Sequence, residues 1–159
     1  MKVEIIAVGK IKENYLKHGI AEFKKKLNKH VKFKTIEVNS ERIPNNLSQA
    51  EQNKIKAKEA ESLIAKLDNR AYSLALDPSG KPMTSKGLAK SINNLKVKGY
   101  NKFQFIIGGA LGLDDNLFKA TDYKLSLSTM TFTHEMVRLI IMEQIYRAIK
   151  INKGEPYHI

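Results

Sequence analysis

The chain has 159 residues and a formal net charge of +12, because 28 lysines and arginines outnumber 16 acidic residues. This length suits one domain, and an apolar fraction of 42% is enough for a hydrophobic core without covalent cross-links. The sequence contains no cysteine. That excludes disulfides, thiolate zinc sites, iron–sulfur clusters and cysteine nucleophiles.

The positive charge is concentrated in the first quarter of the chain, where nine lysines lie between positions 10 and 34. Such a surplus favours a polyanionic partner, and nucleic acid comes before a membrane because no basic amphipathic anchor stands out. We expect Lys10, Lys12, Lys24 and Lys25 to bind nucleic acid. For any single lysine, solvation of a helix face is an equally good interpretation.

The first six residues are typical of a short strand rather than a signal peptide. No run of about 18 apolar residues is present, so no membrane span is expected. We expect a soluble cytoplasmic protein.

The first half of the chain predicts two strands and two helices. The apolar run 3–8 predicts a buried strand that ends at Gly9. Apolar residues at helical spacing over 16–27 predict an amphipathic helix. Alternation over 31–38 predicts a second strand, and a long polar helix follows from about 48 to 67.

The second half repeats the alternation of strand and helix three times. Strands are predicted at 72–76, 103–107 and 123–127, and helices at about 85–98, 114–120 and 134–150. Thr84 or Ser85 is expected to cap the first of these helices, and Gly99 to end it. The pattern predicts a single α/β domain over 1–159 with a mostly parallel sheet.

Three predicted strands run into segments rich in glycine and small polar residues: 76–80, 108–112 and 128–132. Ligands of open parallel sheets bind beyond the carboxyl ends of strands. Glycine lets the backbone approach a ligand closely, and small polar side chains offer hydrogen bonds. The glycine segment has neither the Walker nor the dinucleotide-binding spacing. Taken alone, it is more often a plain turn.

The last predicted helix is apolar nearly all round, so it is expected to be buried on most sides. A core helix, or a helix with one core face and one subunit interface, explains this about equally well. Glu143 and Arg147 are four residues apart and are expected to form an ion pair. His134 and Arg138 share a face beside the 128–132 segment, where they are expected to meet an anionic ligand or an RNA phosphate.

The tail ends unusually, with the aromatic Tyr157 and the titratable His158. Chain ends usually fray, so a disordered tail is the alternative to a functional one.

Several segments, in the order in which they stand along the chain, resemble those of a known family. They are Ala7–Lys10, Leu76–Asp77 with Gly80–Pro82, Ile107–Gly112, Leu125–Thr131, His134 with Met136–Arg138, Glu143–Ala148, and Gly154 with Pro156–His158. Together they resemble the bacterial 23S rRNA (pseudouridine-N3) methyltransferases of the H type, in the SPOUT superfamily. The resemblance covers essentially the whole chain, and the ordered set is far more specific than any one motif.

The resemblance implies a SPOUT α/β knot, with a mostly parallel sheet flanked by helices and a deep C-terminal trefoil knot. General rules of chain connectivity argue against any knot. It also implies a homodimer, S-adenosylmethionine as methyl donor and no metal. The donor site it implies comprises Leu76, Gly108, Leu127, Ser128, Thr129, Met130, Thr131 and Phe132. The implied substrate is the pseudouridine at position 1915, in helix 69 of 23S rRNA, within the assembled ribosome.

Methylation at N3 requires loss of the N3 proton, hence a base or stabilisation of a developing anion. His158 and Tyr157 are the candidates for base and orienting group, acting in their own subunit or in a partner. Arg138 is the candidate to stabilise charge or hold a phosphate, and His134 joins the lysines in binding RNA.

The chain departs from the family pattern in two places. Thr133 stands where the family usually has proline, and Ile159 ends a tail that often carries a further basic residue. Two alternatives stay open: a ribosome-binding factor without enzymatic activity, and a SPOUT methyltransferase that acts on tRNA.

Overall fold

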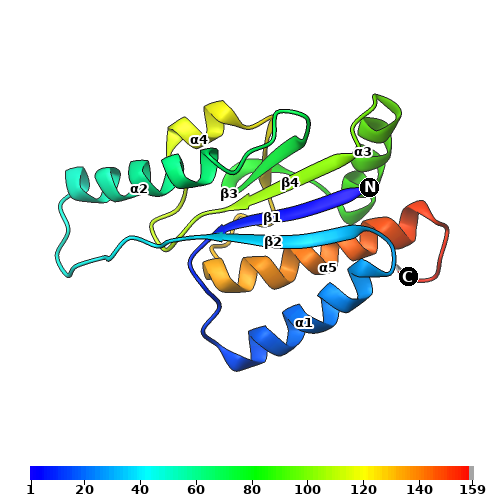
Figure 1. The fold of residues 1–159 in the computed structure, drawn as a ribbon, viewed down its shortest axis with the longest axis horizontal. Helices are drawn as coiled ribbons and strands as arrows, with labels where there is room; N and C mark the ends of the chain where they lie inside the picture. Colours follow the sequence, from blue (N-terminus) through cyan, green and yellow to red (C-terminus); the bar gives the residue numbers. More distant parts are fainter. Residues whose placement is uncertain (158–159) are drawn as a thin grey trace.

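Five parallel strands form one sheet in the order β2-β1-β4-β3-β5 (Figure 1). The computed structural model describes residues 1–157. Its elements are β1 (Lys2–Val8), α1 (Asn14–Asn28), β2 (Lys32–Val38), α2 (Gln49–Ile64), β3 (Tyr72–Pro82), α3 (Ser85–Val97), β4 (Lys102–Ile107), α4 (Asp115–Ala120), β5 (Tyr123–Ser126) and α5 (His134–Asn152). The predicted α/β class, parallel sheet and order of elements are confirmed.

The third strand is longer than predicted, because Asp77–Gly80 does not end it. β3 continues to Pro82 through a bulge, and Leu76 and Lys81 both pair with Leu125 of β5. A bulge accommodates proline and glycine without ending a strand. Gly80 is required there, since an added Cβ would lie 2.6 Å from the carbonyl oxygen of Lys124.

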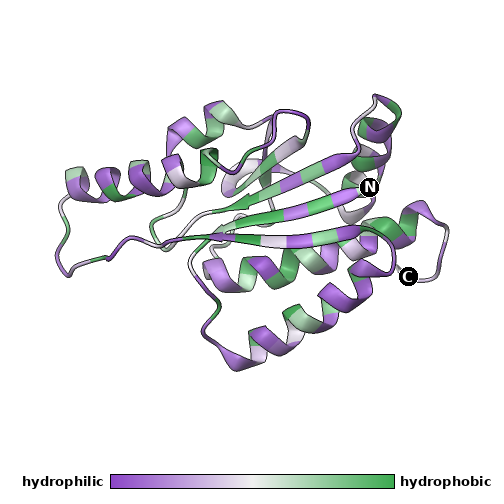
Figure 2. Ribbon diagram, viewed as in Figure 1, coloured by the Kyte–Doolittle hydropathy of each residue, from purple (hydrophilic) through white to green (hydrophobic). Residues whose placement is uncertain are grey.

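Alternate residues of the strands face two separate hydrophobic cores. Val3, Ile5 and Ala7 of β1 pack into a core with α1, α3 and α5. Ile6 and Val8 pack into a smaller core with α2 and α4 on the other face. In Figure 2, hydrophilic and hydrophobic segments alternate along α1 and α2, as expected for helices that bury one face. The most extensively buried helix is α5, between α1 and α3.

Side-chain caps fix where several helices begin. Thr84 caps α3, as expected, and its hydroxyl accepts a hydrogen bond from the Gly87 N–H at 2.9 Å. Ser48 and Glu51 form a reciprocal capping box at the start of α2. These caps satisfy backbone N–H groups that have no partner inside a helix.

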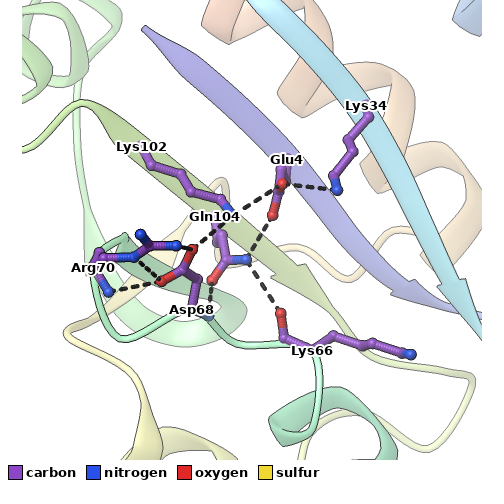
Figure 3. Close-up of polar contacts among 7 residues, drawn as sticks. All are labelled: Glu4, Lys34, Lys66, Asp68, Arg70, Lys102 and Gln104. Atoms are coloured by element: carbon purple, nitrogen blue, oxygen red, sulfur yellow. Dashed lines mark hydrogen bonds and ion pairs between the residues drawn. The ribbon is translucent and has the colours of Figure 1, made fainter.

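A polar network ties together the amino-terminal ends of the strands (Figure 3). The side chains drawn are those of Glu4, Lys34, Lys66, Asp68, Arg70, Lys102 and Gln104. The buried amide of Gln104 donates to Glu4 at 2.7 Å, and the Lys102 ammonium lies 3.1 Å from Glu4 and 3.0 Å from Asp68. Burial by itself would raise the pKa of Glu4, but Gln104, Lys102 and Lys34 lower it overall.

Within residues 1–157, no helix has the length and apolar character needed to cross a membrane. The trefoil knot implied by the resemblance stays a prediction.

Candidate functional site

A cavity of about 680 Å³ opens at the carboxyl ends of β4 and β5 and beside the bulge of β3. The three segments singled out in the sequence meet there, together with the first turn of α5. Its lining residues are Leu76–Pro78, Ile107–Leu113, Leu127, Ser128, Met130–Glu135 and Val137. The three segments therefore lie together as predicted, although the first of them is the bulge of β3 and not its end.

The glycine loop after β4 is held in a tight turn. The Gly112 N–H donates to the Gly109 carbonyl oxygen at 3.1 Å. A Cβ on Gly108 would lie 2.9 Å from the backbone of Gly112 and from Leu113. Gly112 adopts φ +85°, a conformation that side chains disfavour. The loop therefore brings bare backbone to the cavity wall, where its polar groups can contact a ligand.

The segment after β5 is fixed by its own serines and exposes two large apolar side chains. The Ser126 hydroxyl donates to the Ser128 carbonyl oxygen, and the Met130 N–H donates to the Ser128 hydroxyl, both at 3.0 Å. Met130 is 72% exposed and Phe132 is 39% exposed, although both line the cavity. Exposed apolar groups beside a cavity are typical of a ligand-binding site.

Thr133, where the family usually has proline, caps α5. Its hydroxyl accepts a hydrogen bond from the Met136 N–H at 3.3 Å. The next residue, His134, lines the cavity and is half-buried. Burial lowers the pKa of His134; Arg138 and Lys12 lower it further, whereas Glu135 opposes them. The imidazole is therefore mainly neutral near pH 7.

The cavity lining is electrostatically unlike the rest of the protein. Among the described residues, no lysine or arginine lines it, in a chain with a net charge of +12. Asp77 and Glu135 are the two carboxylates in the wall. Lys124 lies 3.9 Å from Asp77 but does not itself line the cavity. Two carboxylates and a neutral His134 in the wall favour a cationic ligand over a phosphate. No group of three or more histidine and carboxylate side chains within residues 1–157 is placed to hold a metal ion.

Seven of the eight residues expected to bind the donor line this cavity, and Thr129 does not. Sequence reasoning left out other residues of the wall: Asp77, Pro78, Ile107, Gly109–Leu113, Thr133, Glu135 and Val137. Most belong to segments already singled out. The signal for Glu135 and Val137 was their place in the first turn of a helix that begins beside a ligand loop.

Arg138 lies apart from the cavity wall. It is 3% exposed, and its guanidinium donates to Glu37 at 2.8 Å and to the carbonyl oxygens of Val8 and Gly9 at 2.9 and 2.6 Å. His134 and Arg138 therefore do not present one common ligand-facing surface. A direct contact between Arg138 and RNA would require it to leave these partners.

The lysines expected to bind RNA fall into two groups. Lys10 and Lys12 are exposed on the loop after β1, and the Lys12 N–H donates to the Glu135 carboxylate at the cavity. Lys24 and Lys25 are exposed near the far end of α1. Only the first group lies beside the cavity.

The tail packs against the other end of α5. The Tyr157 ring meets that of Tyr146 edge-on, with centroids 4.9 Å apart, and the Arg147 guanidinium lies 4.9 Å from its centre. Arg147 also forms the expected ion pair with Glu143, at 2.7 Å. Twelve residues of helix, about 18 Å, separate Tyr146 from His134. Tyr157 is thus far from the cavity of its own subunit. His158, the candidate base, lies outside the described residues.

The sequence model of the family described as "Predicted SPOUT methyltransferase" matches residues 1–158. The chain belongs to the SPOUT methyltransferase family. Its five-stranded parallel sheet flanked by helices agrees with the α/β fold that the resemblance implied.

Three relatives are similar to this SPOUT methyltransferase over 158 residues, 99% of each chain. They come from Halothermothrix orenii, at 56% identity, Clostridioides difficile, at 51%, and Alkaliphilus oremlandii, at 47%. Each is named ribosomal RNA large subunit methyltransferase H.

Proposed function

We propose that the protein is a cytoplasmic enzyme that transfers a methyl group from S-adenosylmethionine to N3 of a pseudouridine in 23S rRNA. The proposed target is position 1915, in helix 69 of the assembled ribosome. Membership of the SPOUT methyltransferases supports the reaction type. The names of the full-length relatives support large-subunit rRNA as substrate.

The absence of lysine and arginine from the described cavity wall carries the choice of donor. S-Adenosylmethionine has a sulfonium and an ammonium group against one carboxylate, so its net charge is positive. Asp77 and Glu135 complement that charge, while Leu76, Ile107 and Leu127 offer apolar surface to the adenine ring. A volume of about 680 Å³ is within the usual range of sites for ligands of this size.

When bound, the donor supplies an electrophilic methyl group, and the protein positions the acceptor and receives its proton. Holding the two reactants in line contributes much of the rate. We assign to His158 the removal of the proton from N3, and to Tyr157 the orientation of the reacting groups. Since Tyr157 lies at the far end of α5, these residues would act in the cavity of a second subunit.

The proposed role of the tail requires a homodimer, and the surface of α5 supports one. Met136, Ile140, Glu143 and Arg147 form a partly exposed stripe along α5, at helical spacing. The opposite side of the helix is buried in the core through Ile141, Met142 and Ile145. Pairing two copies of this stripe about a two-fold axis across α5 would carry the tail of one copy toward the cavity of the other.

Two measurements test the proposal. Calorimetry with S-adenosylmethionine should show saturable heat, whereas a ribosome-binding factor without enzymatic activity should show none. Transfer of labelled methyl should be fastest to assembled ribosomes lacking the modification, and mass spectrometry should place the label on N3 of the helix 69 pseudouridine. Label found on tRNA and not on 23S rRNA would refute the proposed substrate.

A further inference from the structure

A buried carboxylate lies directly behind the glycine loop of the cavity. Glu59, on α2, is 5% exposed. A Cβ added to Gly109 would lie 3.0 and 3.1 Å from its two carboxylate oxygens. The backbone N–H of Glu41 donates to one of these oxygens at 3.3 Å. Because Gly109 lines the cavity, one glycine separates this charge from a bound ligand.

Glu59 has no ion-pair partner among residues 1–157. The other buried glutamate, Glu4, is paired with Lys34 and Lys102, each at 3.1 Å. Burial raises the pKa of Glu59; the Glu41 N–H opposes this, and the Glu41 charge adds to it. A buried carboxylate without a cation is costly, so a purely structural role would be served better by an uncharged side chain.

We propose that Glu59 is a positioning residue of the donor site, which acts through Gly109 to favour the cationic sulfonium over the neutral thioether product. The inference rests on the proposed function. In methyl transfer the methyl group moves to N3, the N3 proton passes to a base, and the sulfur loses its positive charge. In its ionised form Glu59 places a negative charge behind the loop, which attracts the cationic donor and not the neutral S-adenosylhomocysteine. Burial raises the pKa of Glu59, and a bound cation opposes that effect and favours the ionised form.

The inference requires Gly109 as well as Glu59. Any side chain at Gly109 would displace the carboxylate or the loop, because Val8 also lies 3.2 Å from the position of its Cβ. Glycine thus allows the charged group to lie against the wall of the cavity. Adenosine is identical in donor and product, so a loop that only contacted adenosine would need no carboxylate behind it. The carboxylate is useful only where the ligand carries a positive charge.

The test is the ratio of the affinities for S-adenosylmethionine and S-adenosylhomocysteine, measured by calorimetry on the full-length protein. Glu59→Gln keeps the shape and the hydrogen bond from Glu41. It should weaken donor binding about tenfold and leave product binding within about twofold. Gly109→Ala should weaken both ligands to a similar degree. Glu61→Gln is the matched control, since Glu61 is exposed on the same helix and has no contact with Glu59, and it should leave the ratio unchanged.

The ratio should also fall as the pH is lowered, because protonation of Glu59 removes its charge. Asp77, Glu135 and His134 face the same ligand, and Glu41 with Lys58 lies behind Glu59. Protonation of His134 would also disfavour a cation. The part of the pH dependence that Glu59→Gln abolishes is therefore the part due to Glu59.

The outcomes separate the two proposals. If wild type binds neither ligand, the proposed function fails, and this inference with it. If wild type binds both and Glu59→Gln leaves their ratio unchanged, the inference alone is overturned. Should Glu59→Gln prove too unstable to titrate, the pH profile of His134→Gln decides, because it lacks the contribution of the imidazole. A ratio that still falls in acid in this variant supports the inference, and a flat profile overturns it.

Discussion

The guanidinium of Arg138 on α5 lies 2.8 Å from the carboxylate of Glu37 on β2. The same guanidinium donates to the last carbonyl oxygens of β1 and its turn, so one buried side chain joins three elements next to the cavity. Its Nε has no hydrogen-bond partner within the described residues. This arrangement holds the first turns of α5 in place.

Replacing Arg138 tests whether it is structural or catalytic. Arg138→Met should lower the free energy of unfolding by about 3 kcal/mol, because it removes the guanidinium donor from the buried Val8 carbonyl oxygen and the part-buried Gly9 carbonyl oxygen. Denaturant titration measures the loss. Glu37→Gln should cost less, since Glu37 is 40% exposed. A stable Arg138→Met variant that binds donor normally but no longer methylates would contradict this and restore the catalytic role expected from the sequence.

Removing residues 157–159 tests the tail. The truncated protein should bind S-adenosylmethionine with wild-type affinity, because Tyr157 does not line the cavity of its own subunit and its proposed role in the partner's cavity concerns the acceptor. Methylation of ribosomes should fall at least about a hundredfold, the usual scale for loss of a proton-transfer group. Unchanged turnover would remove the tail from the mechanism.

Mixed dimers test which subunit supplies the tail. Gly108→Ala should abolish donor binding, because its Cβ would collide with the backbone of Gly112. Each homodimer, of this variant or of the truncated chain, should be inactive. A heterodimer of the two should regain about half of the activity, since it retains one complete composite site. If co-expression restores nothing, the proposed arrangement of subunits is wrong.

Salt dependence tests the two groups of lysines. Naked helix 69 RNA should bind weakly, with a steep dependence on salt from phosphate contacts. Lys10→Gln and Lys12→Gln should each lower the slope of log affinity against log salt by about one. Lys54→Gln is the control, because Lys54 is exposed on α2, and it should not change the slope. A flat response of wild type between low and moderate salt would refute phosphate binding.

The network around Glu4 predicts a loss of stability in acid. The folded protein lowers the pKa of Glu4, so this group stabilises the fold above the ordinary carboxylate pKa. That contribution is lost as the pH falls through the lowered value. Glu4→Gln should therefore be less stable than wild type near neutral pH, and the two unfolding free energies should converge toward acid. A constant gap between them would contradict the assigned role.

The sequence predicted the elements well, because each has a local signal. Apolar periodicity marked the helices, and Thr84 marked a helix start through a bond to a neighbour three residues away. The bulge of β3 was missed for the opposite reason. Asp77–Gly80 contains strong turn residues, and only pairing with β5, more than 40 residues later, keeps the strand going.

The site was predicted in part. The three segments at strand ends were recognisable because parallel strands bring their carboxyl ends to one edge. The roles of individual side chains were harder to foresee. Arg138 and His134 are one turn apart on a helix but have different surroundings, because the end of β1 covers Arg138 and not His134. Glu59 was not predicted as a site residue, because its position behind Gly109 depends on how α2 packs against the sheet.

The sequence by itself determined the alternation of strands and helices, the excess of positive charge and the family, all of which are written in local order along the chain. Within residues 1–157, only the tertiary structure decided that no lysine or arginine lines the cavity and that Arg138 is buried. It also placed Tyr157 against Tyr146, which lies about 18 Å along α5 from His134. The physical reason is that charge and burial at a site depend on which distant segments pack around it.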